Sequence, residues 1–390
     1  MNEELIFEEE MIDEDETVVE YDIVSTPRDL TPANIVEMVD AGLIDLPLFQ
    51  RNYVWDQKKA SKLIESLILG LPVPELFFYS EADDSSYKII DGQQRLLTIY
   101  FFMKGRFPRN TQSRLEIRRS LNLGMPLEDV LKDDDNFFSF KLKLNEKEEQ
   151  ENSPLEGLTY QDLEKEVQVK FRLRRFLRTV VVRQNKPTDD SSSMFEIFTR
   201  LNTGGAPLNH QEVRASLYYC KFYEMMVIVN DNANWRKLLG NSEPDLHCND
   251  IELILRSFAL LEDFENYIPK MVSFLNKYSQ KSRKFDKEKI MYLQDLFVSF
   301  IESCGKLSDK AFYRNNRFSK VLFETVFATV CFNSYKNKEL LMGKINSESF
   351  EKLKSDPEFI EYLQAGLAAQ ANVAGRLKRA RQILVIDEVE

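Results

Sequence analysis

The sequence contains few of the residues on which several kinds of catalytic site depend. Its only histidines are His210 and His247. An HNH nuclease needs two or more histidines close together, so that chemistry is not encoded here, and both are expected to be structural or surface residues. The four cysteines form no Cys-x-x-Cys pair; they are Cys220, Cys248, Cys304 and Cys331. We therefore expect free thiols in a reducing compartment, and neither a zinc site nor a disulfide framework.

The sequence also lacks a membrane span and a Walker-type phosphate loop. No apolar run approaches the roughly 20 residues that cross a bilayer, and the acidic N-terminus resembles neither a signal peptide nor a transit peptide. We therefore expect a cytoplasmic protein with no membrane partner. The GxxxxGK[ST] motif is missing, because Gly305 and Gly343, the glycines followed by lysine, have no glycine at the required upstream position.

Basic residues are absent from the first 22 positions, which hold eleven acids and are called the acidic segment below. The acids are Glu3, Glu4, Glu8, Glu9, Glu10, Asp13, Glu14, Asp15, Glu16, Glu20 and Asp22. Because like charges repel, we expect a disordered tail that acts as a solubilising segment, a nucleic-acid mimic or a partner-docking segment. The net charge of −12 becomes −1 once these eleven charges are set aside. That near-neutral body argues against strong non-specific DNA binding.

The N-terminal half predicts helices and strands in alternation. A Thr31 cap before Pro32 should begin a helix that ends at Asp40, and apolar residues recur with helical spacing further along the chain. The predicted helices cover residues 32–40, 57–69 and 93–103, and the predicted strands cover residues 75–79 and 87–90. The two strands should form a hairpin whose second strand leads directly into the third helix.

The rest of the chain predicts one more strand and then mostly helices. The continuous β-branched run at residues 179–182 suits a central strand buried on both faces. Ser193 with Glu196 predicts a helix start, and Asn209 with Glu212 predicts a second helix that reaches about Val229. The expected fold class is α+β, with three parts: the acidic segment at 1–22, a small mixed sheet with flanking helices at 23–220, and an all-α domain at 221–390.

The turn Asp91-Gly92-Gln93-Gln94-Arg95 is the leading candidate for an active centre. A strand, a tight glycine turn and a helix start bring free backbone N–H groups toward a ligand, and helix N-termini attract phosphate. Gly92 would allow close approach of the backbone, and Arg95 could hold a phosphate bidentately. Asp91 could ligate magnesium or act as a base, and Gln94 could orient a water or recognise a base. The alternative is an exposed polar turn.

Three further segments are weaker candidates. The first segment contains Gln50, Arg51 and Tyr53. These residues either stack on a base and contact a phosphate, or the aromatic ring packs in the core and has no ligand. The end of the helix that is predicted to start at Ser193, and the loop after it, either supply hydrogen-bonding groups to a ligand or merely end the helix. The candidate residues there are Arg200, Asn202, Thr203 and Gly204. The basic run from Lys170 to Arg183 is either a nucleic-acid stripe or a solvated helix face.

Together the segments around Arg51, Asp91 and Gly204 resemble the N-terminal domain of GmrSD-type restriction proteins, which is related in fold to ParB and sulfiredoxin. The resemblance covers residues 28 to 220. It implies nucleotide binding and hydrolysis within bacterial defence against phage. By similarity, Gln50, Arg51 and the Asp91–Arg95 turn would line the nucleotide pocket, and the loop from Asn202 would help to close it.

Proteins of this type carry an HNH nuclease domain, and this sequence lacks the cluster of histidines that such a domain needs. The expected function is therefore that of an Mg²⁺-dependent NTPase, which serves as a regulatory or sensor component of a bacterial anti-phage or restriction system acting on DNA. The expected partner is an NTP, and DNA and a separate nuclease or other defence protein are further candidates. Two alternatives stay open. The first is a magnesium-dependent DNA-nicking enzyme of the ParB-like kind, and the second is a non-catalytic module that binds a nucleotide without turnover.

Overall fold

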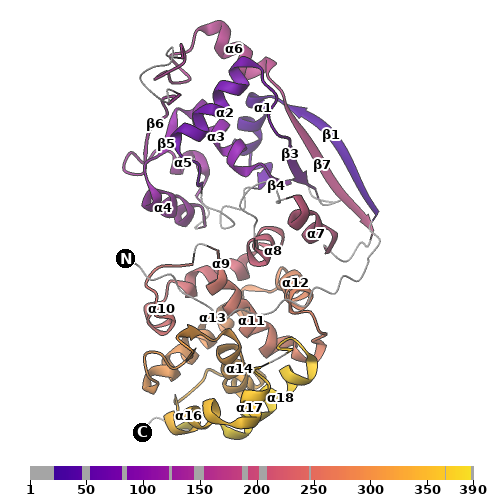
Figure 1. The fold of residues 1–390 in the computed structure, drawn as a ribbon, viewed down its shortest axis with the longest axis vertical. Coiled ribbons are helices and arrows are strands. Elements are labelled where there is room, and N and C mark those ends of the chain that lie inside the picture. The colour runs from indigo at the N-terminus through magenta and orange to yellow at the C-terminus, as the bar shows by residue number, and fades with distance from the viewer. Residues whose placement is uncertain are drawn as a thin grey trace. The chain divides into compact units, whose positions relative to one another are not determined.

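The structure is a computed structural model, and it describes residues 22–45, 53–80, 86–122, 125–144, 153–186, 192–201, 209–245, 247–364 and 366–387. The chain forms two compact units that meet between Leu217 and Tyr218, three residues before the boundary expected from the sequence. Figure 1 shows the sheet and its helices in the N-terminal unit and a helical C-terminal unit. No helix in the described ranges is both long and apolar enough to cross a bilayer.

The N-terminal unit is built on a mixed five-stranded sheet with the order β1-β7-β3-β4-β2. The strands are β1 (Asp22–Leu30), β2 (Ile44–Asp45), β3 (Leu76–Tyr79), β4 (Tyr87–Asp91) and β7 (Leu177–Lys186). β3 pairs antiparallel with β4, as the predicted hairpin requires, and parallel with β7. β1 and β7 form a long antiparallel ribbon at one edge (Figure 1). The expected α+β class, with a small mixed sheet and flanking helices, is confirmed.

Helix caps are present on α1 (Pro32–Asp40) and α2 (Gln57–Leu69), and the cap at Thr31 is the one predicted from the sequence. The Thr31 hydroxyl accepts the Asn34 amide at 3.2 Å, and Pro32 fills the first helical position. The Asp56 carboxylate accepts the Lys59 amide at 2.7 Å, and Gly70 ends α2 in the left-handed conformation. These local signals set the helix ends because each satisfies backbone groups that a helix leaves open.

The third helix, α3 (Gln93–Lys104), lies at the centre of the unit with most of its side chains buried. Aromatic rings from a following subdomain pack around it; that subdomain contains β5 (Arg106–Pro108), α4 (Thr111–Asn122), α5 (Leu127–Val130) and β6 (Phe137–Ser139). Phe102 makes edge contacts with Phe140 and Phe171 at centroid distances of 5.4 and 5.7 Å. The stretch from residue 105 therefore completes the core around α3.

Three sequence interpretations change in the structure. β7 is not buried on both faces, because its neighbour β1 is an exposed edge strand and Val180 and Val181 stay half-buried. The basic run is not one helix face, since it divides between α6 (Lys165–Arg174) and β7. The helix after α7 (Ser192–Leu201) does not reach Val229: α8 (His210–Tyr218) ends, and an extended Cys220 caps α9. No glycine or proline marks that break.

The C-terminal unit is helical, as expected, with two ladders of two-residue strands. Its helices are α9 (Lys221–Asn230), α10 (Ala233–Leu239), α11 (Asn249–Asp263), α12 (Met271–Ser282), α13 (Lys287–Ser303), α14 (Lys320–Val330), α15 (Phe332–Asn337), α16 (Ser347–Ser355), α17 (Pro357–Glu361) and α18 (Gln370–Ile383). Its strands are β8 (Tyr313–Arg314), β9 (Arg317–Phe318), β10 (Lys344–Ile345) and β11 (Ile386–Asp387).

A buried carboxylate joins three of these helices. Glu324 on α14 pairs with Arg256 of α11 at 2.5 Å and with Arg376 of α18 at 2.8 Å, and all three side chains are buried. Removing the carboxylate would leave two guanidinium groups facing each other without an anion between them. Burial makes that arrangement costly because the groups cannot be solvated.

We expect Glu324→Gln to lower the free energy of unfolding by about 3–5 kcal/mol, the usual cost of breaking a buried ion pair. Chemical denaturation followed by circular dichroism measures it. Asp309→Asn is the control, because the Asp309–Lys237 pair is exposed on both sides and should contribute little. Equal effects of the two substitutions would show that the buried carboxylate does not hold α11, α14 and α18 together.

Candidate nucleotide site

The turn at the end of β4 is shaped by Gly92. Its φ of 97° and ψ of 10° place it in the left-handed region, where it serves as the N-cap of α3. A Cβ atom at this position would lie 2.4 Å from Cδ2 of Leu76, so only glycine fits between β3 and the helix start. The strand, glycine turn and helix start predicted from the sequence are all present.

Arg95 folds back over Gly92 and joins the ends of two strands. Its Nη2 donates to Oδ2 of Asp91 at 2.7 Å and to the carbonyl oxygen of Glu75 at 2.8 Å. The Arg95 side chain is 14% exposed and that of Asp91 is 33% exposed. Two of the three catalytic candidates, Asp91 and Arg95, are therefore in direct contact at the edge of the core, and Asp91 is the partner that solvent reaches more easily.

Two buried donors beside this pair have no hydrogen-bond partner among the described residues. They are Nε2 of Gln93 and Nε of Arg95. Both belong to the first turn of α3, whose N-terminus carries no side-chain cap. Buried polar groups are almost always satisfied by protein, water or ligand. Donors left open at a helix N-terminus match the requirements of an anionic oxygen.

Gln94 holds the segment before α2. Its Oε1 accepts the backbone N–H groups of Val54 and Trp55, at 2.9 and 3.3 Å. Arg114 of α4 donates to the carbonyl oxygens of the same two residues, at 3.3 and 3.0 Å. Two of the three sequence segments assigned to the site thus lie against each other, and Arg114 is a part of the arrangement that the sequence did not indicate.

Tyr53 lies in the core beneath this clamp. Its hydroxyl is 2.7 Å from the Thr98 hydroxyl, and its ring makes edge contacts with Phe101 and Phe107. Burial raises the pKa of the Tyr53 phenol well above its ordinary value. Arg114 stands over the same ring at 5.8 Å. In the described structure this tyrosine packs as an aromatic plug, which is one of the two readings left open by the sequence.

The structure describes only one of the remaining predicted residues, Arg200. Arg200 is exposed near the end of α7 and pairs with Glu196 one turn earlier, at 2.5 Å. The others lie outside the described residues; they are Gln50, Arg51, Asn202, Thr203 and Gly204. In the described ranges, no three His, Cys, Asp or Glu side chains come together as a metal-binding cluster.

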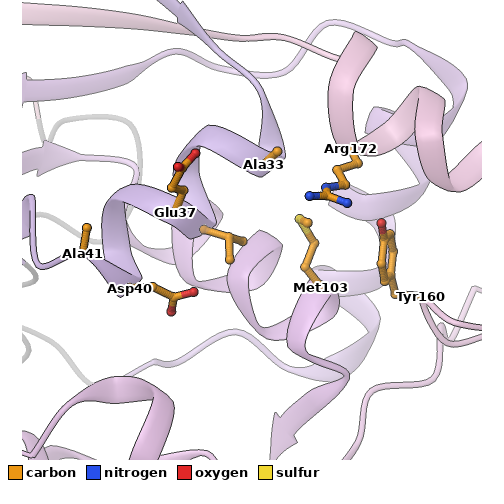
Figure 2. Close-up of a pocket in the computed structure, with 8 residues that line it drawn as sticks. Ala33, Glu37, Asp40, Ala41, Met103, Tyr160 and Arg172 are labelled. Atoms are coloured by element: carbon orange, nitrogen blue, oxygen red, sulfur yellow. The ribbon is translucent and has the colours of Figure 1, made fainter.

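A surface pocket of about 650 Å³ lies away from the turn (Figure 2). It is lined by α1, by Met103 near the far end of α3, by Tyr160 and by Arg172 of α6. Ten residues of helix separate Met103 from Gln93, a distance of about 15 Å at the helical rise. The pocket and the Asp91 turn are therefore different features of this unit.

The fold and the turn together define a mixed α/β domain with two open donors in the first turn of its central helix. Residues 33–219 match the family model described as the GmrSD restriction endonuclease, N-terminal domain. The match confirms, over this part of the chain, the resemblance found in the sequence. No curated protein and no solved structure matches the chain.

Gly92→Ala should destabilise the N-terminal unit by about 1–3 kcal/mol, because it adds both a strained backbone and a clash with Leu76. Gly42→Ala is a matched control: Gly42 also has a positive φ, of 67°, but a Cβ there meets nothing within 4 Å. Thermal unfolding should rank the two variants. If Gly42→Ala costs as much as Gly92→Ala, close packing at the turn is not what requires glycine.

Gln94→Leu should loosen the segment at residues 53–56, because two backbone N–H groups lose their acceptor. Hydrogen exchange at Val54 and Trp55 should then become faster. Gln94→Glu is the control, since it keeps an oxygen in place. Unchanged exchange in Gln94→Leu would mean that Arg114 alone holds this segment.

Proposed function

We propose that the N-terminal unit binds and hydrolyses a nucleoside triphosphate, and that it does so as a regulatory or sensor component of a restriction system that acts on DNA. The family description supports the second part, because it names a restriction endonuclease. The observation that carries the first part is the pair of buried open donors, Gln93 Nε2 and Arg95 Nε, at an uncapped helix N-terminus. Phosphate oxygens would satisfy both donors.

The residues of the turn have separable roles in this proposal. Arg95 would bind a phosphate oxygen through Nε while Nη2 keeps its bonds to Asp91 and Glu75. Gly92 would let the backbone reach the phosphate without a side chain in between. Gln94 would position Trp55 and the segment before it, since its carbonyl already holds that backbone.

Asp91 fits a magnesium ion that arrives with a nucleotide. One of its oxygens is held by Arg95, and its side chain is 33% exposed, so solvent reaches the carboxylate. Mg²⁺ in such sites commonly takes one or two carboxylates together with phosphate oxygens and waters. A bound Mg²⁺ would neutralise phosphate charge and polarise the reacting groups. Asp91 would also hold Arg95 in the orientation that aims Nε at the ligand.

A non-catalytic binding module is the second candidate. One observation favours it: Arg95 already joins β3 to β4 through Glu75 and Asp91, which is a structural task that needs no turnover. Binding without hydrolysis would then be the whole activity. DNA nicking by this chain is the third candidate. It would be detected as magnesium-dependent relaxation of a supercoiled plasmid.

Phosphate release from ATP, GTP, CTP and UTP with Mg²⁺ tests the proposal. Asp91→Asn and Arg95→Lys should each lower turnover of the preferred nucleotide by about 100-fold, as is typical when one preorganised group is lost. Arg106→Lys is the matched control, because Arg106 likewise bonds one carbonyl oxygen, of Leu131, and one aspartate, Asp134. It should keep full turnover.

The other outcomes separate the three candidates. Saturable binding with no turnover in the unchanged chain would support the non-catalytic module. Neither binding nor turnover with any of the four nucleotides would exclude both nucleotide functions. Plasmid nicking that survives Arg95→Lys would assign DNA chemistry to another part of the molecule.

A further inference from the structure

The pocket of Figure 2 is formed by one face of α1 and by residues of the elements around it. α1 packs against both α3 and α6, so the walls of the pocket belong to one packed group of helices. Residues three or four apart share a helix face, and the α1 side of the pocket follows that spacing: Ala33, Val36, Glu37, Asp40 and Ala41. The volume of about 650 Å³ lies in the range of small-molecule sites.

The two acids on the α1 side differ in how their charge is neutralised. The carboxylate of Asp40 accepts the Tyr100 hydroxyl at 2.6 Å on one oxygen and the Lys104 ammonium at 2.8 Å on the other. Glu37 is exposed and forms no ion pair with any residue that the structure describes. Asp40 is therefore a fixed part of the wall, whereas the negative charge of Glu37 is open to a ligand.

The opposite side of the pocket carries a cation and a hydroxyl. Figure 2 shows Arg172 and Tyr160 next to each other, across from α1. The Arg172 guanidinium is exposed, and in the described part of the chain it has no hydrogen-bond or ion-pair partner. The Tyr160 ring is anchored against Phe102 and Phe171, at centroid distances of 5.9 and 6.2 Å. Burial raises the pKa of the Tyr160 phenol, and the charge of Arg172 lowers it in part.

Apolar side chains lie between these two charged sides. Met103 stands between α1 and Tyr160 in Figure 2, and Val36 adds a branched side chain from α1. The thioether of Met103 is soft and adapts to the shape of its neighbours. The pocket thus has an open negative charge on one side, an open positive charge on the other, and an apolar surface in the middle.

We propose that this pocket binds the C-terminal end of a peptide. The terminal carboxylate would accept hydrogen bonds from the Arg172 guanidinium and the Tyr160 hydroxyl. The last side chain of the peptide would lie on Met103, and an ammonium group further along the peptide would meet Glu37.

Other ligand classes fit the pocket less well. A phosphate would satisfy Arg172, but it would leave the apolar surface uncovered and would bring a second negative charge near Glu37. A purely apolar ligand would bury both open charges without partners. A ligand with opposite charges separated by an apolar group satisfies all three parts of the pocket.

Calorimetric titration of the full chain with tripeptides, without nucleotide, tests the proposal. The probes are Lys-Ala-Leu and Lys-Ala-Phe, each with a free carboxylate or with a C-terminal amide. The amides should bind at least about tenfold more weakly, because a neutral amide loses the charge-assisted bonds. Arg172→Gln should abolish this difference. Arg174→Gln is the matched control, since Arg174 is an exposed arginine of the same helix that does not line the pocket; it should keep the difference.

Glu37→Gln tests the other side of the pocket. It should weaken the binding of the lysine tripeptides by about two- to fivefold, the effect of an exposed ion pair, and leave acetyl-Ala-Ala-Leu unaffected. Glu37 and Arg172 are both exposed, so neither substitution removes a core contact. Circular dichroism checks that the variants are folded.

Three results would overturn the proposal. The first is the absence of binding by any of the tripeptides at millimolar concentration. The second is binding that survives Arg172→Gln undiminished, which would place the peptide elsewhere on the chain. The third is binding of inorganic phosphate, lost in Arg172→Gln, that is tighter than the binding of the tripeptides; the pocket would then be a phosphate site.

Discussion

The site depends on one guanidinium group. Arg95 bonds the Asp91 carboxylate and the Glu75 carbonyl with the same nitrogen and lies over Gly92. These contacts fix the spacing of β3 and β4 where both strands meet α3. They also hold Nε of Arg95 in a buried position with no hydrogen-bond partner in the described structure. The Arg95 side chain thus forms a structural ion pair through Nη2 and keeps an open donor at Nε. The ion pair fixes the guanidinium group, and this is why Nε stays in its buried position.

The rest of the N-terminal unit supports that arrangement. α3 is buried along most of its length, so the aromatic residues around it leave its first turn little freedom to move. Gln94 and Arg114 hold the backbone of Val54 and Trp55 from its donor and its acceptor sides. The donors of the turn are consequently held in place by the fold itself, and a phosphate bound there, as proposed, would meet a preorganised set of donors, the condition under which electrostatic stabilisation is effective.

The sequence predicted the parts that depend on local signals. Thr31 and Gly92 each act on backbone groups within a few residues, and the helix and the turn that they delimit are present. Long-range packing was harder to foresee. Arg114 acts on residues about 60 positions earlier in the chain, and no short motif records such a contact. The break at Cys220 and the change from α6 to β7 also lack a glycine or proline that would mark them.

The most direct test is a structure of the chain with Mg²⁺ and a non-hydrolysable form of the nucleotide that binds most tightly. The account predicts phosphate oxygens within about 3.2 Å of Arg95 Nε and Gln93 Nε2, with the Arg95–Asp91 pair intact. A nucleotide bound elsewhere, for example in the pocket beside Arg172, with both donors still open, would contradict the assignment of the Asp91–Arg95 turn as the site.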